Sequence, residues 1–366
     1  MVVQYLARNL SKLGAEVHAL ACTDDYVDDG GVFVHKAWRD GSATYPLSVA
    51  WSAIKVKPDV VNVHHEYLLY GGVRYAPLFP LMLVLLKFLV RKPIVLTMHS
   101  VLPLSKLDKP FFRRYTKAVA LTPLLRLGIW LITKLSAKLA DLVAVTLEEG
   151  KKVLVSDYGI SPEKVVVVKY GNVVYDGVSP ARDSPKRGKK RLVFLGLPRP
   201  GRGLFDAIKM MKYLDDCELF IVGPDHPRAQ GYGLLLEKLV QEEGLQDRVV
   251  FVRKYVDGEE KLKILQQADV VLVTYDEEYI IGASTALGDV SYLGKPVVSH
   301  DVYKAREDLP PELLGKPNDP ASLAKAVRYA LENAEEVGEA LRKKALSWTW
   351  EDFAKAYREL YSAAKA

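Results

Sequence analysis

The sequence is poor in cysteine and in side-chain amides. Its 366 residues contain only two cysteines, Cys22 and Cys217, which are far apart and lack the spacing of a metal site or a redox motif. A disulfide framework like that of small secreted domains is therefore excluded, and we expect two thiols in a reducing compartment. Five asparagines and six glutamines are few for this length, and scarcity of heat-labile amides favours a thermophilic source.

Long hydrophobic runs and several familiar catalytic motifs are also missing. The longest apolar run, residues 76–90, contains Lys87 and is shorter than the roughly 20 residues that span a bilayer. Residues 1–10 lack the basic and apolar regions of a signal peptide, so we expect a cytoplasmic protein. No GxSxG, Walker or HExxH motif occurs, which argues against hydrolase, P-loop and zincin functions.

Acidic residues are almost absent from one segment. Residues 67–140 contain twelve lysines and arginines and one acid, Asp108. No nucleic-acid-binding motif accompanies them, so we expect no nucleic-acid partner. Apolar runs between the cations favour an anionic membrane surface instead, with a peripheral protein on its cytoplasmic face. Phe111 and Phe112 are the expected point of entry, within a cluster formed by Lys106, Lys109, Arg113, Arg114 and Lys117. The alternative is that these cations only solvate an amphipathic helix.

Short apolar runs alternate with helical patterns from one end of the chain to the other. The runs are rich in valine and leucine and lack polar alternation, which is typical of strands buried on both faces of a parallel sheet. Alternation with helices predicts βαβ units and doubly wound sheets. The expected strands are 15–22, 60–64, 94–98, 142–145, 165–169, 191–195, 219–222, 249–252, 270–274 and 296–299.

Length and composition predict two domains. At 366 residues the chain is too long for one average core. Residues 176–190 contain prolines, glycines and five basic residues with no large apolar residue after Val178, which indicates a linker. We therefore expect domains at 1–175 and 191–348, with a closing helix at 349–366.

The start of the sequence is unusual for such a fold. Residues 1–13 have a helical pattern that Gly14 ends. A doubly wound sheet normally places a strand and a glycine-rich turn before this helix. We therefore expect the first domain to lack its first strand and the natural protein to be longer.

A glycine-rich turn follows the strand at 191–195. Gly196 ends the strand, and Gly201 and Gly203 flank Arg202 before a helix begins. Backbone N–H groups at such a turn suit an anion, and the forked donors of Arg199 and Arg202 suit a diphosphate. The alternative is an ordinary tight turn with solvated arginines.

A second polar loop follows the strand at 270–274. Gly282, Ser284 and Thr285 open a helix, which is the pattern of another phosphate site. Asp289 lies one turn further along and can accept paired sugar hydroxyls. The alternative is a solvated aspartate on an amphipathic helix.

Histidines follow two of the expected strands. His64 and His65 end the strand at 60–64, and His99 follows the strand at 94–98. Ligands bind at the carboxyl ends of parallel strands, so these residues are site candidates, although a lone histidine is more often a core residue. No nearby set of acids gives a metal-ligand spacing.

At this point the sequence resembles the retaining glycosyltransferase family four, which has the GT-B fold. The resemblance covers nearly the whole chain and lies in an ordered set of segments: ARNLSKLGAEVHAL, VVNVHHEY, IVLTMHS, DLVAVTLEEGKKVL, LGLPRPGRG, LFIVGP, ADVVLVTY, LGKPVV and SWTWEDFAKAYRELY. It implies two Rossmann-like domains facing a cleft. It also implies metal-independent, cofactor-free transfer of a sugar, with retention, from a nucleotide-sugar donor held by the second domain to an acceptor on the first.

The resemblance assigns residue roles. Arg202 matches the family's diphosphate-binding lysine, and His99 matches the histidine beside the donor sugar. Asp289 matches a glutamate that binds the ribose. His64 and His65 then lie on the acceptor side.

Two positions depart from the family pattern. Leu197 stands where the family has a phosphate-binding arginine, and Arg199 is the expected substitute. Ile281 stands where the family has a sugar-binding glutamate, and Glu277 or Glu278 is the expected substitute.

These features leave three hypotheses. The first is an active hexosyltransferase that builds a glycolipid or polysaccharide. The second is a catalytically silent GT-B scaffold or binding protein, which the two departures favour. The third is a GT-B enzyme of another reaction, such as a nucleotide-sugar epimerase.

Overall fold

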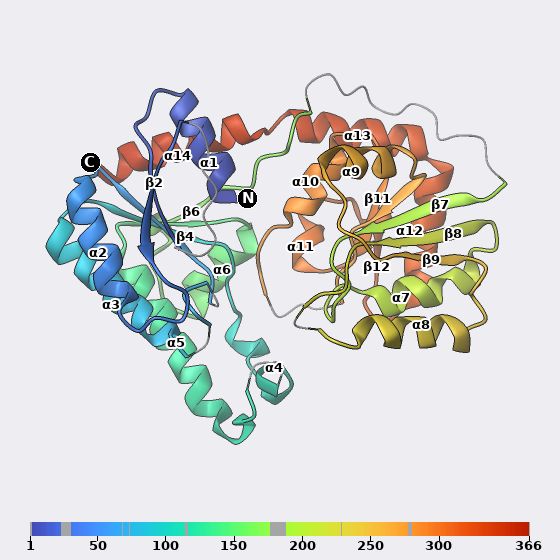
Figure 1. Cartoon of the computed structure of the whole chain (residues 1–366), viewed down its shortest axis with the longest axis horizontal. Helices are drawn as coiled ribbons and strands as arrows, with labels where there is room; N and C mark the ends of the chain where they lie inside the picture. Colours follow the sequence, from blue (N-terminus) through green and yellow to red (C-terminus); the bar gives the residue numbers. More distant parts are fainter. Residues whose placement is uncertain are drawn as a thin grey trace. The chain divides into compact units, whose positions relative to one another are not determined.

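The computed structural model describes residues 2–22, 31–67, 69–72, 74–113, 116–175, 188–227, 229–276 and 280–365. The chain divides into two compact units (Figure 1). The first unit contains Met1–Tyr170, Tyr279–Ala283 and Trp350–Ala366, and the second contains Gly171–Glu278 and Ser284–Thr349. Most of the predicted linker, 176–187, lies outside the described residues, and Lys190 already begins a strand.

The first unit is built from parallel strands and helices. Its strands are β1 (His18–Cys22), β2 (Phe33–Trp38), β3 (Val61–His65), β4 (Ile94–Met98), β5 (Leu142–Val145) and β6 (Val165–Val167). Its α-helices are α1 (Val2–Lys12), α2 (Tyr45–Val56), α3 (Phe79–Leu85), α4 (Lys109–Arg113), α5 (Thr122–Leu139), α6 (Glu148–Ser156) and α14 (Trp350–Lys365). Short helical turns are η1 (Ala76–Leu78), η2 (Leu86–Val90), η3 (Leu104–Lys106), η4 (Val119–Leu121) and η5 (Pro162–Lys164).

The strands of the first unit form two separate parallel sheets. One has the order β3-β4-β5-β6, and the other pairs β1 with β2. Every residue of β4 is buried, which is the reason that this strand reads as an unbroken apolar run. Among the described residues, no strand pairs with both β1 and β3, so the two sheets are not joined.

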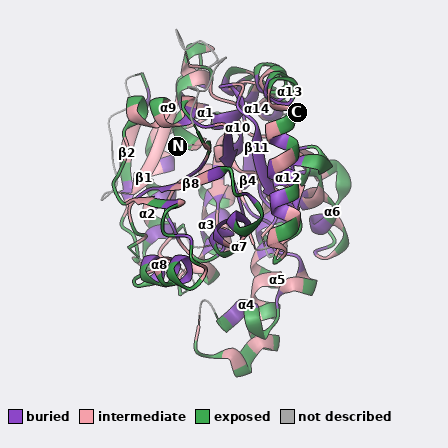
Figure 2. Cartoon of the chain, turned by 90° about the vertical axis from the view of Figure 1, so that its right-hand side faces the viewer, coloured by how far each residue is buried: buried purple, intermediate pink, exposed green. Residues whose placement is uncertain are grey.

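The second unit contains one parallel sheet of six strands in the order β12-β11-β10-β7-β8-β9. Its strands are β7 (Lys190–Leu195), β8 (Cys217–Val222), β9 (Val249–Val252), β10 (Val270–Leu272), β11 (Val297–His300) and β12 (Leu314–Gly315). The helices are α7 (Leu204–Lys209), α8 (Tyr232–Glu242), α9 (Gly258–Gln266), α10 (Thr285–Ser291), α11 (Tyr303–Arg306), α12 (Pro320–Glu332) and α13 (Ala334–Leu346), with short turns η6 (Met210–Tyr213) and η7 (Pro311–Leu313). Buried residues concentrate in the strands and on the inner sides of the helices (Figure 2). The prediction of an α/β protein with two Rossmann-like domains is confirmed.

In the basic segment, residues 67–140, the burial of two phenylalanines differs from the sequence-based expectation. Phe111 and Phe112 on α4 are only 5% and 4% exposed. They pack with Leu102 and Leu107 in a small apolar cluster. The prediction that these two phenylalanines enter a lipid headgroup layer is therefore wrong, because their rings are already covered by the protein.

Helix α14 packs against the first unit through aromatic side chains. The Tyr357 hydroxyl lies 2.9 Å from Thr97 Oγ1 on β4, and Trp350 stacks on Tyr5 of α1 at 4.8 Å between ring centroids. Phe353 is fully buried between Trp350 and Tyr357. The last helix of the chain is therefore part of the core of the first unit.

This packing makes Phe353 a sensitive position for stability. We expect Phe353→Ala to destabilise the first unit by about 3–5 kcal/mol, because a large buried ring is replaced by a cavity. Urea unfolding followed by tryptophan fluorescence measures the change through the neighbouring Trp350. The matched control is Arg358→Ala on the exposed side of α14, which should stay within about 0.5 kcal/mol of wild type. Equal unfolding midpoints for the two variants would contradict this account of the core.

Candidate functional site

In the first unit, candidate residues gather at the carboxyl ends of β3 and β4. Successive side chains of a strand point to opposite faces, and this separates the two histidines at the end of β3. His64 stacks on His99, with 5.1 Å between ring centroids. His65 is 2% exposed and packs edge-on against Phe79 and Tyr67. His64 and His99 therefore form a pair, whereas His65 belongs to the apolar core.

The histidine pair lies within a chain of hydrogen bonds. Asn62 Nδ2 lies 3.3 Å from His64 Nε2, His64 Nδ1 lies 2.9 Å from His99 Nε2, and His99 Nδ1 lies 2.6 Å from the Tyr170 hydroxyl. Asn62 Oδ1 accepts from Thr97 Oγ1, so its Nδ2 is a donor and His64 Nε2 must accept. The neutral ring of His64 then donates from Nδ1 to His99, and the neutral ring of His99 donates from Nδ1 to Tyr170. Both ring nitrogens of His99 thus have protein partners.

Burial keeps these histidines uncharged. Loss of hydration lowers the pKa of His64 to about 3, and the neighbouring His99 lowers it further in the same direction. Burial also lowers the pKa of His99 to about 4. Both rings are therefore neutral at physiological pH and serve as hydrogen-bonding groups rather than as cations.

Two more polar side chains meet beside the histidine pair. Ser100, which follows His99, donates a 2.6 Å hydrogen bond to Glu66 Oε2. Glu66, Ser100 and Tyr170 were not predicted as site residues. Glu66 and Ser100 follow strands at whose carboxyl ends ligands are expected to bind. Tyr170 is distant from both strands in the sequence, and no pattern in its segment predicts this contact.

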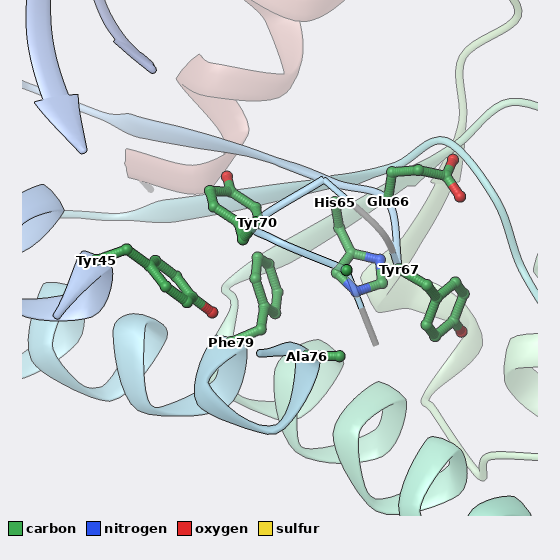
Figure 3. Close-up of a pocket in the computed structure, with 8 residues that line it drawn as sticks. Tyr45, His65, Glu66, Tyr67, Tyr70, Ala76 and Phe79 are labelled. Atoms are coloured by element: carbon green, nitrogen blue, oxygen red, sulfur yellow. The ribbon is translucent and has the colours of Figure 1, made fainter. Parts of the chain in front are cut away.

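A small pocket lies on the core side of β3 (Figure 3). Its volume is about 10 Å³, which is room for one water molecule. Figure 3 shows His65 pointing toward Phe79, whereas Glu66 points away from them. The pocket is lined by Tyr45, His65, Glu66, Tyr67, Tyr70, Gly72, Ala76 and Phe79. It is too small to hold a sugar.

Gly282 also belongs to the first unit. Val101 and Ile281 form an antiparallel bridge, with N···O distances of 2.8 and 2.9 Å. A Cβ on Gly282 would lie 2.3 Å from the carbonyl oxygen of His99, so only glycine allows this approach. Ile281 is 2% exposed and packs close to Gly150. The segment that was predicted to open a phosphate site is therefore packed against the end of β4 at these two residues.

In the second unit, the glycine-rich turn follows β7 as predicted from its sequence. Gly196 has φ of 143° and Gly203 has φ of 62°, conformations that side chains rarely adopt. A Cβ on Gly203 would lie 2.6 Å from the ring of His300. The buried His300 is held by Asp206, with 3.1 Å between Nε2 and Oδ2. This packing behind the turn fixes the path of its backbone.

Arg202 is the main charged group at this turn. Its guanidinium carbon lies 5.1 Å from the centre of the Phe194 ring and 5.0 Å from that of Tyr275, and its Nη2 is 3.3 Å from the position of a Cβ on Gly196. Burial lowers the pKa of Arg202, although an arginine remains charged. Among the described residues, no carboxylate lies within ion-pair distance of it. Among the described residues, the contacts of the Arg202 guanidinium are thus with aromatic rings rather than with a carboxylate.

Tyr275 connects Arg202 to the second predicted phosphate loop. The Tyr275 hydroxyl lies 2.6 Å from Ser284 Oγ, and Lys304 Nζ on α11 lies 5.1 Å from the centre of the same ring. Two cations and a helix start thus surround one tyrosine. Lys304 was not predicted, because its segment carries no glycine-rich turn or other phosphate signature.

The structure gives fewer contacts for the remaining candidate residues of the predicted donor site. Arg199 donates to the carbonyl of Pro200 at 3.1 Å. Thr285 begins α10, and Asp289 lies one turn further along that helix. Glu277 and Glu278 lie outside the described residues. The described residues contain no group of three or more His, Cys, Asp or Glu side chains that could hold a metal ion.

Comparisons with known proteins agree with this architecture. Residues 1–171 match the family model "Glycosyltransferase Family 4", and residues 189–333 match "Glycosyl transferases group 1". No curated protein matches the sequence.

Solved structures match over the whole chain. A glycosyltransferase from Rickettsia africae has a TM-score of 0.73 at 15% identity, over 99% of this chain and 93% of that one. Anabaena HepE in complex with UDP has a TM-score of 0.73 at 16% identity, over 99% and 95%. Sucrose-phosphate synthase from Thermosynechococcus elongatus has a TM-score of 0.73 at 18% identity, over 99% and 93%. At these identities the structural matches establish the fold. Because the two family models account for both domains and the fold agrees, the chain belongs to the GT-B glycosyltransferases.

Proposed function

We propose that this protein transfers a hexosyl group, with retention and without a metal ion, from a nucleotide-sugar donor to a glycolipid or polysaccharide acceptor. The observation that carries the proposal is the guanidinium of Arg202, held between two aromatic rings beside the turn at Gly196 without a carboxylate among the described residues. The Anabaena HepE structures, in complex with UDP and with UDP-glucose, support a uridine nucleotide as the first donor to test.

The proposed chemistry assigns Arg202 to the leaving group. As the bond from the anomeric carbon to the diphosphate breaks, negative charge grows on the departing oxygen. A preorganised cation stabilises that charge more in the transition state than in the ground state. The acceptor hydroxyl oxygen bonds to the anomeric carbon, and its proton passes to the departing diphosphate. Lys304 adds a second positive charge beside Tyr275.

His99 is proposed to contact the transferred sugar as a neutral ring. Its pKa of about 4 leaves it without charge at physiological pH. Its two nitrogens are hydrogen-bonded to His64 and Tyr170, so contact with a sugar hydroxyl requires exchange of one of these partners. The displaced partner must then bond to the sugar itself, because a buried donor or acceptor left unpaired costs about 1–3 kcal/mol.

The second candidate function is a catalytically silent GT-B binding protein. The observation in its favour is Ile281, which occupies the family's sugar-binding position but is buried in a bridge to Val101. Hydrolysis of a panel of UDP-, GDP- and ADP-sugars separates the two candidates. The transferase should release a nucleoside diphosphate from at least one donor, whereas a silent protein releases none.

We expect Arg202→Ala to weaken binding of UDP or GDP by about 2 kcal/mol, because a charge-assisted contact to phosphate is lost. Calorimetric titration measures the loss, and Arg202→Lys should fall between alanine and wild type because it keeps the charge but not the fork. The matched control is Arg253→Ala in the same unit, since Arg253 already has Asp225 and Glu237 as partners. Equal nucleotide affinity of wild type and Arg202→Ala would remove the diphosphate role.

We expect His99→Gln to lower kcat while the affinity for UDP or GDP is retained, because His99 lies in the first unit and is assigned to the sugar. Since the folded pKa of His99 is about 4, the ring is neutral above that pH and protonated below it. The wild-type rate between about pH 5 and pH 8 should therefore show no step from this residue. Steady-state kinetics over that range, together with calorimetry of the variant, test both points. An unchanged kcat in the variant would exclude His99 from the reaction.

A further inference from the structure

Helix α5 and the preceding residue, Leu121 of η4, carry a row of exposed leucines. Leu121, Leu124, Leu127, Leu131 and Leu135, here called the leucine ridge, are 42–62% exposed. Their spacing of three or four residues places them on one face of the helix. The segment Val119–Leu139 is long and apolar enough to cross a membrane by length and composition, yet only 11% of its most apolar window is buried. Figure 2 shows this helix coloured mainly as exposed and half-buried. Such a contiguous apolar surface marks an interaction site.

The opposite face of α5 is attached to the first unit. Thr133, Ser136 and Ala137 are buried, and Thr133 Oγ1 lies 2.8 Å from the Tyr67 hydroxyl. Trp130 donates from Nε1 to the carbonyl of Asp157 at 3.2 Å. A helix held in this way lies on the surface of its domain with one face outward. This is the geometry of an interfacial helix rather than a membrane-spanning one.

Exposed apolar side chains continue beyond the end of α5. Phe88 and Leu89 on η2 are 64% and 53% exposed. Lys87 Nζ, on the same turn, donates to the carbonyl of Leu139 at 2.9 Å, so η2 lies next to the end of α5. Arg91 is exposed and donates to the carbonyl of Phe88. The apolar surface therefore continues with cations at its border.

Cations dominate the charge of this surface, and Asp141, which follows α5, is already paired with Lys87 at 3.4 Å. Residues 109–140 contain seven lysines and arginines and no acid. Apart from Pro123 and the ridge, the exposed residues of α5 are Arg126 and Lys138. Among the described residues, neither of these cations has an acidic side chain within ion-pair distance. Exposed leucines bordered by cations without acidic partners are suited to an anionic lipid bilayer. The leucines can enter its apolar interior while the cations contact its negatively charged headgroups.

We propose that the first unit docks on an anionic lipid bilayer through the leucine ridge, with α5 lying in the headgroup layer and Arg126 and Lys138 contacting the lipid phosphates. The docking face is therefore α5, and not the buried Phe111 and Phe112. This inference is independent of the transferase activity, because it rests on the surface of α5 and the adjoining turns η2 and η4. A second copy of the chain fits the same face poorly, since a two-fold contact would bring the same cations together without an acid.

Vesicle co-sedimentation tests the proposal with the full-length protein and no donor present. Wild type should pellet with vesicles that contain about 30% phosphatidylglycerol and should pellet less with pure phosphatidylcholine. Pelleting should fall as salt rises from about 0.05 to 1 M. The double variant Leu124→Ser/Leu131→Ser should reduce the partition coefficient at least about tenfold on anionic vesicles, because two apolar side chains no longer enter the bilayer.

The matched control is Leu234→Ser/Leu235→Ser on α8 of the second unit, whose leucines are 66% and 55% exposed. It should pellet like wild type. A charge variant, Arg126→Gln/Lys138→Gln, should lose about fivefold per residue on anionic vesicles and little on phosphatidylcholine. Circular dichroism checks that each variant is folded.

Two outcomes would overturn the proposal. One is equal pelleting of the α5 and α8 leucine variants with anionic vesicles. The other is sedimentation velocity showing a wild-type dimer that only the α5 variant disrupts, together with no vesicle binding. That pattern would assign the ridge to a second copy of the chain.

Discussion

A mostly buried guanidinium needs an anion, and the described protein supplies none to Arg202. Two aromatic rings hold the side chain in place, which stabilises a cation only modestly compared with water or a carboxylate. The glycines at 196 and 203, the Tyr275–Ser284 hydrogen bond and the His300–Asp206 pair all fix the backbone or the rings around this charge. These contacts fix the position of the Arg202 guanidinium at the turn after β7, which is where we propose that the diphosphate binds.

At the strand ends of the first unit, the candidate side chains are neutral, in contrast to the charged Arg202 of the second unit. His64 and His99 are buried and neutral, and the hydrogen bonds from Asn62 to Tyr170 assign a direction to each ring. Helix α14 contributes to the same network, because Asn62 also donates to the Tyr361 hydroxyl at 2.8 Å. A set of neutral, oriented groups suits the recognition of sugar hydroxyls, whereas the cation of the second unit suits a diphosphate.

The sequence predicted the strands well where they are buried on both faces. The bounds of β4 and β5 were predicted to the residue, because their unbroken apolar runs are buried on both faces. Those of β9 were also predicted to the residue, although this strand is partly exposed. Strand β2 was missed since its residues, FVHKAW, include charged and exposed positions, and β12 was missed because it has only two residues. The glycine-rich turn and Arg202 were visible as a local pattern. Tyr170, Tyr275 and Lys304 were not assigned, because contacts between residues far apart in sequence leave no periodic signal. For Phe111 and Phe112, composition gave the apolar character but not the direction in which the rings point.

A crystal structure of the protein with bound UDP or GDP tests whether Arg202 binds the diphosphate. We expect the diphosphate to lie at the turn after β7, within hydrogen-bond distance of the Arg202 guanidinium and close to the start of α10. A nucleotide bound elsewhere, with Arg202 still enclosed by Phe194 and Tyr275 and without contact to phosphate, would contradict it.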